Sequence, residues 1–419
     1  MKVTILTYGS RGDVQPFVAL ANGLMKRGYE VKLAAPHRFG NFVGAYKIPF
    51  IPLAGDPEEM SRRINDAGTN AIRIISSIKD YVFAIAPLVS RSAFQACEGA
   101  DLLIHSFLFT VGAHSWAREH SIPDVSIQGF PMFAPTREFP SVAMSQLPPG
   151  VLSYLSHWVA TQAFWYGGNM GYGPARRANP DIPYPEKLYW PFDADPVRPR
   201  TPMLCAWSQN VLPRPSDWPP NIHVTGYFFL DADPSFQPPA DLQEFLDAGK
   251  PPVCISFGSM INRNAERIDQ IVRDALAKTG QRGIFLSGWS NIIHESSKDI
   301  FYCNDVPHDW LLSRCEMIIH HGGAGTTSSG LRAGIPNIVV PFTADQPFWG
   351  KRVYAIGAGP QPILVKHLSI ENLTNAMAEA EDENLRNRAK DLGQRIRSED
   401  GVEQAIGLIE GYESKYKSE

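Results

Sequence analysis

Residues 317–327 read MIIHHGGAGTT, an apolar run that ends in two histidines, three glycines and two threonines. The run Met317–His320 has the length and composition of a buried strand, and the turn leads into a helix that ends near Gly334. Glycines let backbone amides approach an anion closely, and a helix start favours phosphate through its free amides and dipole. The stretch therefore predicts a strand, a turn and a helix that together hold a diphosphate.

The turn has two other possible interpretations. A tight strand-to-helix turn without a ligand would also use glycines. An ATPase that transfers phosphoryl groups is disfavoured, because the turn lacks the lysine of a GxxxxGK[ST] loop.

A second motif, PFTADQPFWG at residues 341–350, follows the apolar run 337–340. The adjacent Asp345 and Gln346 offer acceptors and donors that suit pairs of sugar hydroxyls. Capping of the next helix is the alternative role for Asp345.

The rest of this half of the chain is also built from short apolar runs and helical repeats. Residues 253–257 and 283–286 are predicted strands, and residues 268–276 carry apolar side chains at helical spacing. Beyond residue 370 the chain is predicted to be helical and charged. Alternating strands and helices build parallel sheets, which bind ligands at the carboxyl ends of their strands.

The first half repeats the same pattern. Residues 3–6 are a predicted strand, and residues 9–12 are a glycine turn that follows it. Apolar residues recur at helical spacing from Phe17, and residues 31–35 are the next predicted strand. Further strands are expected at 102–104 and 125–127, with a helix at 111–119 between them. Two parallel α/β domains follow from these repeats.

Residues 130–220 break the pattern, since they are rich in proline and aromatic residues and show weak periodicity. We expect loops and short helices there, lining a cleft. The proline-rich stretch 231–252 is the predicted linker. The expected organisation is an N-terminal acceptor-binding domain at 1–230, this linker, a C-terminal donor-binding domain at 253–395, and a C-terminal helix at 396–419 that packs back on the N-terminal domain.

The charge and composition of the chain argue against several classes of protein. The 419 residues carry a net charge of −4, which argues against a general nucleic-acid binder. The five cysteines include no CxxC pair, which argues against a disulfide framework or a zinc site and favours a reducing cytoplasm. The apolar start breaks at Tyr8, too early for a signal peptide, and no run is long enough to span a membrane. Membrane contact is therefore expected to be peripheral at most.

The donor-side motifs carry a resemblance that spans residues 306–359. VPHDW at 306–310, the histidine and glycine turn, GIP at 334–336 and DQP at 345–347 resemble the donor signature of family 1 glycosyltransferases, which have the GT-B fold. GSRGDVQP at 9–16 resembles the branch that holds sterol glucosyltransferases and glycopeptide-antibiotic glycosyltransferases, and segments 134–140 and 215–230 favour the sterol side. The resemblance implies two Rossmann-like parallel-sheet domains that face each other across a cleft.

The same resemblance implies roles for individual residues. The diphosphate would be held by Ser10, Ser259, His321, Gly323, Gly325 and Thr326. The transferred sugar would be held by Asp345 and Gln346, and the nucleoside by Trp289, Val306 and His308. Trp310 is a second candidate for stacking on the base, or it belongs to the core. Ser329 stands where plant members have a glutamate that binds ribose.

Asp13 is the predicted catalytic base, because it follows the first strand, where the acceptor hydroxyl must lose its proton. It could instead cap the helix that starts near Val14. Lone histidines at 105 and 114 are possible helpers. No metal is expected, since no carboxylate cluster exists to hold one.

The acceptor pocket is predicted in the aromatic segment, with Phe130, Met132, Phe133 and Trp165 as its contacts. A flat apolar acceptor such as a sterol would suit these rings, although most of them can equally be core. Together with these rings, the resemblance implies an inverting transfer of glucose from UDP-glucose to a sterol-like hydroxyl. Alternatives are a polyketide, macrolide or glycopeptide acceptor, a nucleotide-sugar-binding protein without turnover, and an epimerase of the same fold.

Overall fold

The computed structural model describes residues 1–67, 71–182, 184, 200–233, 235–257, 265–286, 295–303 and 306–418. The chain divides into two compact units. Unit 1 comprises Met1–Gln209, Pro213–Leu230 and Asp400–Glu419, and unit 2 comprises Asn210–Leu212 and Asp231–Glu399.

In its described part, unit 1 contains a parallel sheet of seven strands in the order β3-β2-β1-β4-β5-β6-β7. The first five follow the order of a doubly wound Rossmann sheet, in which the strand order reverses between β1 and β4. The strands are β1 (Lys2–Leu6), β2 (Glu30–Pro36), β3 (Phe50–Leu53), β4 (Leu102–Ser106), β5 (Asp124–Gln128), β6 (Met203–Cys205) and β7 (Ile222–Val224).

Helices cover both faces of this sheet. Apolar side chains of α1, α2 and α14 pack on one face, and those of α4 and α5 pack on the other. The helices are α1 (Arg11–Lys26), α2 (Gly40–Ala45), α3 (Pro57–Ala67), α4 (Ala71–Cys97), α5 (Thr110–Glu119), α6 (Val151–Ala178) and α14 (Gly401–Ser418), with single 3₁₀ turns η1 (His37–Phe39), η2 (Phe107–Phe109) and η3 (Val142–Met144).

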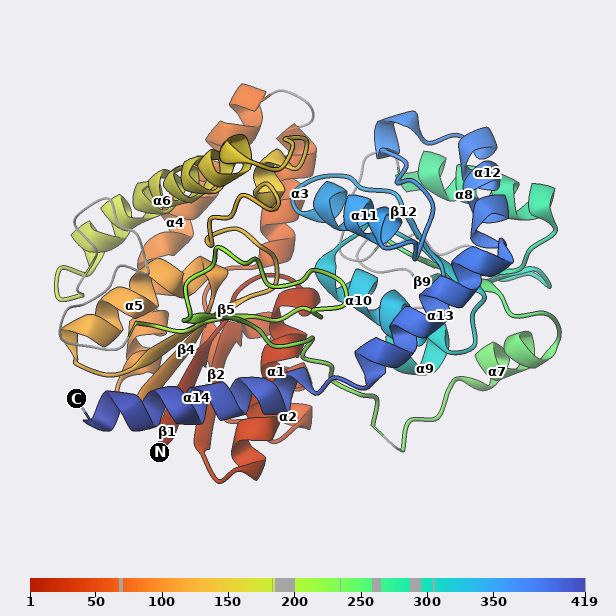
Figure 1. Cartoon of the computed structure of the whole chain (residues 1–419). Coiled ribbons are helices and arrows are strands. Elements are labelled where there is room, and N and C mark those ends of the chain that lie inside the picture. The colour runs from red at the N-terminus through yellow and green to blue at the C-terminus, as the bar shows by residue number, and fades with distance from the viewer. Residues whose placement is uncertain are drawn as a thin grey trace. The chain divides into compact units, whose positions relative to one another are not determined.

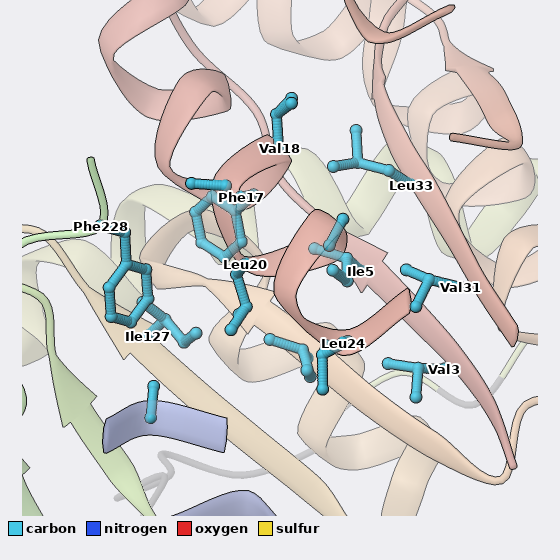
Figure 2. Packing of buried hydrophobic residues seen from close by; sticks show 14 of the residues in the cluster. Val3, Ile5, Phe17, Val18, Leu20, Leu24, Val31, Leu33, Ile127 and Phe228 are labelled. Atoms are coloured by element: carbon cyan, nitrogen blue, oxygen red, sulfur yellow. The ribbon is translucent and has the colours of Figure 1, made fainter. Parts of the chain in front are cut away.

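The face under α1 forms the largest core of unit 1. Figure 2 shows Leu20 and Leu24 of α1 lying over Val3 and Ile5 of β1, with Ile127 of β5 beside them. Burying one such side chain contributes roughly 1.5–3 kcal/mol. Val14 and Phe17 of the same core hold the start of α1 against the sheet.

Helix α14 belongs to unit 1, although it follows all of unit 2 in the sequence. It lies beside α1 (Figure 1), and a Cβ on Gly23 of α1 would come within 2.6 Å of Val402. The two helices therefore approach closely because position 23 carries no side chain.

Unit 2 repeats the Rossmann order in a smaller sheet, β10-β9-β8-β11-β12, again parallel throughout its described part. The order reverses between β8 and β11. Its strands are β8 (Val253–Ser256), β9 (Gly283–Leu286), β10 (Ile300–Cys303), β11 (Met317–His320) and β12 (Asn337–Val339), and its helices are α7 (Ala240–Asp247), α8 (Ala265–Thr279), α9 (His308–Leu312), α10 (Ala324–Ala333), α11 (Gln346–Ala355), α12 (Ile370–Ala380) and α13 (Glu383–Arg397), with the 3₁₀ turn η4 (Val365–His367).

One prediction about the middle of the chain is wrong. Residues 130–220 do not consist of loops and short helices only, because α6 runs for 28 residues through them. Its apolar periodicity is weak because apolar side chains lie on both sides of the helix: Val151, Leu152 and Trp158 are exposed, whereas Ala160, Trp165 and Ala175 are buried. The stretch 231–252, predicted as the linker, contains α7. In the described part of the chain, no helix combines the length and apolar character needed to cross a membrane.

Candidate active site residues

The loop between β1 and α1 positions Asp13. Ser10 is the N-cap of α1, and Asp13 lies in the helix's first turn. The Asp13 Oδ2 atom accepts hydrogen bonds from the Ser10 backbone N–H at 2.7 Å and from the Ser10 hydroxyl at 2.9 Å. Thr7 donates from Oγ1 to the Asp13 carbonyl oxygen at 2.8 Å, so the loop is held from both sides.

These bonds leave one carboxylate oxygen available. In the described residues no hydrogen bond reaches Oδ1 of Asp13. Asp13 therefore serves the helix cap through Oδ2 and can receive a proton through Oδ1, so the capping and base roles coexist. Burial raises the pKa of the Asp13 carboxyl above its ordinary value, against the lowering effect of the two Ser10 bonds. A raised pKa makes a carboxylate a better proton acceptor.

Gly9 is required by this arrangement, and sequence reasoning gave it no separate role. Its φ is +136°, and an added Cβ would come within 2.3 Å of Asp13 Oδ2. Only glycine tolerates both the backbone conformation and the close approach of the carboxylate.

Gly9→Ala is therefore expected to displace Asp13, lower kcat and destabilise the fold by about 1–3 kcal/mol. Chemical unfolding and steady-state assays would measure the two effects. Gly12→Ala is the matched control, because the nearest atom to an added Cβ there is the Ser10 Oγ at 3.6 Å. Equal losses in both variants would contradict the proposed role of Gly9.

Two further polar groups lie at the ends of β4, which pairs with β1, and of β5, which pairs with β4. Ser106 ends β4 and Gln128 ends β5, and both side chains are buried. The Ser106 hydroxyl and the Gln128 Oε1 have no hydrogen-bond partner in the described part of the chain. Buried polar atoms usually find a partner, so a bound hydroxyl or water would satisfy them. Their positions at predicted strand ends were the signal that could have identified them.

The two histidines considered as helpers of Asp13 are engaged elsewhere. His105 Nε2 lies 2.9 Å and His114 Nδ1 lies 2.8 Å from Oδ2 of Asp124, and Thr201 donates to Oδ1 of the same residue. This buried network holds the pKa of Asp124 below its ordinary value, chiefly through His114 and despite the opposing effect of burial. Within the described residues, the hydrogen-bond partners of Asp13 include neither histidine.

In unit 2 the turn between β11 and α10 presents unpaired amides. Gly322 adopts φ +88°, and an added Cβ there would come within 2.6 Å of Val339. Gly323 is the N-cap of α10 and provides no side-chain cap. The first backbone bond of the helix comes from Thr327, so the amides of residues 324–326 have no acceptor in the described chain. Such a helix start is suited to an anion.

His321 lies directly over this turn. An added Cβ on Gly323 would come within 2.4 Å of the His321 Nε2, and Nδ1 lies 3.5 Å from the Ser256 carbonyl oxygen, at the outer limit of a hydrogen bond. Burial lowers the pKa of His321 to about 4, so the ring is neutral at pH 7. Thr326 is half-buried and Gly325 is exposed at the same turn, while the Thr327 hydroxyl is buried without a partner in the described residues.

The neighbouring His320 has a different environment. Its Nδ1 accepts a hydrogen bond from the Gly322 N–H at 3.1 Å, so its Nε2 must carry the proton and donate to Asn337 Oδ1 at 3.1 Å. Burial, with the adjacent His321, lowers the pKa of His320 to about 3. His320 is thus a neutral link between β11 and β12.

Asp345 and Gln346 begin α11. Asp345 is the N-cap residue, but its side chain does not cap the helix, because its Oδ2 accepts from the Trp349 indole N–H at 3.0 Å. Gln346 is buried, and its Oε1 accepts from the backbone N–H groups of Phe342 and Thr343. Both side chains are therefore held in fixed orientations by the loop and the helix that carry them.

Two predicted ligand contacts lie outside the described residues: Ser259, predicted for the diphosphate, and Trp289, predicted for the nucleoside. Val306 is buried in the core, and His308 is half-buried at the first position of α9. Trp310, the second candidate for stacking on the base, is half-buried, with the Arg314 guanidinium 4.2 Å from its ring centre and Phe236 at its edge.

Two of the predicted acceptor contacts, Phe130 and Phe133, belong to an aromatic cluster in unit 1. Phe130 meets Phe107 with 4.8 Å between ring centres, and Phe133 meets Phe164 at 5.1 Å. Phe107 and Phe164 connect the two pairs at 6.0 Å. Phe133 and Trp165 are buried, whereas Phe130 and Met132 are half-buried. Phe107, which follows Ser106, is a member that sequence reasoning missed.

Two family models match the chain. Residues 3–105 match the N-terminal domain of glycosyltransferase family 28, and residues 293–403 match the C-terminal domain of erythromycin biosynthesis protein CIII-like proteins. Among solved structures, the glycosyltransferase of kitacinnamycin superposes with a TM-score of 0.68 at 19% identity over 98% of both chains. The calicheamicin glycosyltransferase CalG4 superposes with a TM-score of 0.66 at 16% identity over 98% of this chain and 97% of its own. These likenesses confirm the predicted GT-B fold.

Curated relatives are similar over nearly the whole chain. Sterol 3-beta-glucosyltransferases UGT80A2 and UGT80B1 of Arabidopsis thaliana are each 33% identical over 97% of this chain. The chain covers 64% and 67% of their lengths. A sterol 3-beta-glucosyltransferase of Emericella nidulans is 34% identical over 98% of this chain, which covers 30% of that protein. The chain thus spans about two thirds of the plant relatives and less than a third of the fungal one.

Proposed function

The chain belongs to the glycosyltransferase family of GT-B fold that contains the sterol 3-beta-glucosyltransferases, and we propose that it transfers glucose from UDP-glucose to the hydroxyl of a sterol-like acceptor. The observation that carries the proposal is Asp13, whose carboxylate is fixed through one oxygen and open through the other. A positioned base of this kind typically contributes about 10²–10⁴-fold to a proton-transfer step.

The proposed reaction begins with the acceptor hydroxyl. As its oxygen attacks the anomeric carbon of the sugar, Oδ1 of Asp13 takes the proton, and the bond from the anomeric carbon to the diphosphate oxygen breaks. Attack from the face opposite the leaving group inverts the anomeric centre. Asp345 and Gln346 would bind hydroxyls of the transferred sugar, since the loop fixes their orientations.

The leaving diphosphate is the group that the turn of unit 2 would stabilise. The amides of residues 324–326, the dipole of α10 and His321 are the donors proposed for it. Preorganised donors can each contribute about 3 kcal/mol to the transition state. In this proposal the charge is met by these groups and no metal takes part. Within the described residues no cluster of His, Cys, Asp and Glu could hold one.

The acceptor class is supported by the relatives and by the aromatic cluster. Phe107, Phe130, Phe133 and Phe164 offer apolar ring surfaces, and a flat apolar molecule loses water-exposed area against such rings. The proposed contact surface suits a steroid skeleton. The unpartnered Ser106 and Gln128 atoms would take a polar group of the acceptor.

Release of UDP on adding a sterol to UDP-glucose is the test of this proposal. A sterol delivered from cyclodextrin should raise UDP release well above the rate without acceptor, and the product should carry an inverted, β-configured glucose by NMR. Macrolide and glycopeptide aglycones, and TDP-glucose in place of UDP-glucose, test the other acceptors and donors. UDP binding without transfer to any acceptor would support a binding protein and overturn the proposal.

A further inference from the structure

The outer face of α6 is apolar. In the described part of the chain eleven large hydrophobic side chains are exposed, and seven of them lie on this one helix. Their spacing places them on one side over the first turns of the helix. They are Val151, Leu152, Tyr154, Leu155, Trp158, Val159 and Tyr166.

The inner side of the same turns is polar. Ser153, Ser156 and His157 are buried, and their side chains bond to carbonyl groups of the surrounding backbone. A helix on the surface of a water-soluble protein normally shows the reverse pattern. The outward apolar face therefore indicates that α6 meets an apolar environment, since a contiguous patch of this kind marks an interaction site.

The lack of charged residues around the outer face of α6 indicates what kind of partner binds it. Residues 139–175 contain no Asp, Glu, Lys or Arg, so the exposed face offers no ion pair to a protein partner. Its aromatic residues are Tyr154, Trp158 and Tyr166, which are 45%, 51% and 64% exposed. Tyr and Trp have an apolar ring and a polar tip, and they are enriched where a membrane meets water.

The size of the face argues against a second copy of the chain. A stable protein interface uses roughly 20–30 residues from each partner. The apolar face of α6 has seven large side chains in the described part, all from one helix. A lipid surface needs no matching shape, so a single helix with buried apolar side chains can bind to it.

The helix that carries this face also carries part of the aromatic cluster. Phe164 lies six residues beyond Trp158 in α6, is half-buried, and contacts Phe133 and Phe107 of that cluster. We propose that the outer face of α6 docks on the surface of a lipid bilayer, so that the acceptor leaves the membrane beside the cluster that binds it. This inference rests on the proposed function for the identity of the acceptor, but the docking itself is measured separately.

The test uses the full chain and vesicles of phosphatidylcholine with sterol. The wild type should float with the vesicles, and Leu155→Glu with Trp158→Glu should weaken binding by at least about tenfold, because two charges replace two apolar side chains. Transfer to sterol embedded in vesicles should fall in parallel, whereas transfer to sterol delivered from cyclodextrin should be kept. Tyr354→Glu is the matched control, since Tyr354 is 51% exposed on α11.

Several outcomes would overturn the docking proposal. It is overturned if the wild type does not float with the vesicles, or if the double variant binds them equally well. It is also overturned if light scattering shows a dimer of the wild type that the double substitution dissociates. Both substituted positions are exposed, so thermal unfolding should stay unchanged and exclude misfolding. If no sterol accepts glucose in either form, the proposed function fails, while flotation still decides whether α6 binds lipid.

Discussion

Asp13→Asn is expected to lower kcat by about 10²–10⁴-fold and to leave the affinity for UDP nearly unchanged. Asparagine keeps an oxygen that can accept the two hydrogen bonds from Ser10, so the start of α1 is preserved. It removes only the capacity to take a proton. Steady-state kinetics with UDP-glucose and a sterol, together with calorimetry of UDP binding, measure the two quantities.

The same substitution should keep or raise the stability of the fold, although it lowers the activity. Because burial raises the pKa of Asp13 in the folded chain, the folded state holds that proton more tightly than the unfolded state. Stability from this group is then present at low pH and is lost as pH rises from the ordinary aspartate pKa through the folded value. Asp13→Asn should therefore keep or raise Tm at pH 7, while the activity falls.

The pH profile gives an independent check. The acid limb of kcat/KM in the wild type should lie above the pH at which an exposed aspartate titrates, since the free base must be ionised. Asp382→Asn is the matched control, because Asp382 also accepts a backbone N–H at a helix start, from Leu385 at 3.0 Å, but in α13. An Asp13→Asn variant with wild-type turnover would refute the base assignment.

Most of the fold was predictable because both sheets are parallel and buried on two faces. Such strands are continuous apolar runs, and the predicted strands at 253–257, 283–286 and 317–320 agree with β8, β9 and β11 to within one residue. The end of α10 was equally clear, because Gly334 adopts the left-handed conformation that a helix C-terminus favours.

The secondary structure in the middle of unit 1 was harder to predict from the sequence. Periodicity identifies a helix by apolar side chains that keep to one side, and α6 carries them both outside, at Val151 and Trp158, and inside, at Trp165. Positions along the chain also could not show that His105 and His114 both turn to Asp124, because that contact depends on how β4, α5 and β5 pack. Local motifs were sufficient to predict the candidate site residues. The hydrogen-bond partners of those residues within each unit depend on three-dimensional packing, which the sequence does not show.

The adjacent His321 and His320 should respond to substitution in different ways. His321→Ala is expected to lower kcat by about 10²–10³-fold and to weaken UDP binding, because it removes a donor proposed to meet the leaving diphosphate. Its Tm should fall less than that of His320→Ala, since the one protein contact of its ring polar atoms in the described chain is the 3.5 Å approach to Ser256. Kinetics, calorimetry and thermal unfolding together measure these effects.

His320→Ala should instead lower stability. It leaves the Gly322 N–H and the Asn337 Oδ1 without their present partner, at about 1–3 kcal/mol for each buried group. Urea unfolding would report this loss. The two neighbouring residues thus form a matched pair, in which one change acts on ligand binding and the other on the fold. Equal effects of both variants on UDP binding would mean that the turn merely collapses when either ring is removed.

Proton linkage separates a direct contact from such a collapse. The free His321 ring is neutral at pH 7, with a pKa of about 4, and a bound diphosphate would favour its charged form. UDP binding to the wild type should therefore take up protons and strengthen as pH falls toward that value, beyond what the titration of UDP itself explains. His321→Ala should remove this extra uptake, which calorimetry in buffers of different ionisation enthalpy detects. Identical uptake by the wild type and the variant would show that the ring does not meet the diphosphate, whatever the effect on turnover.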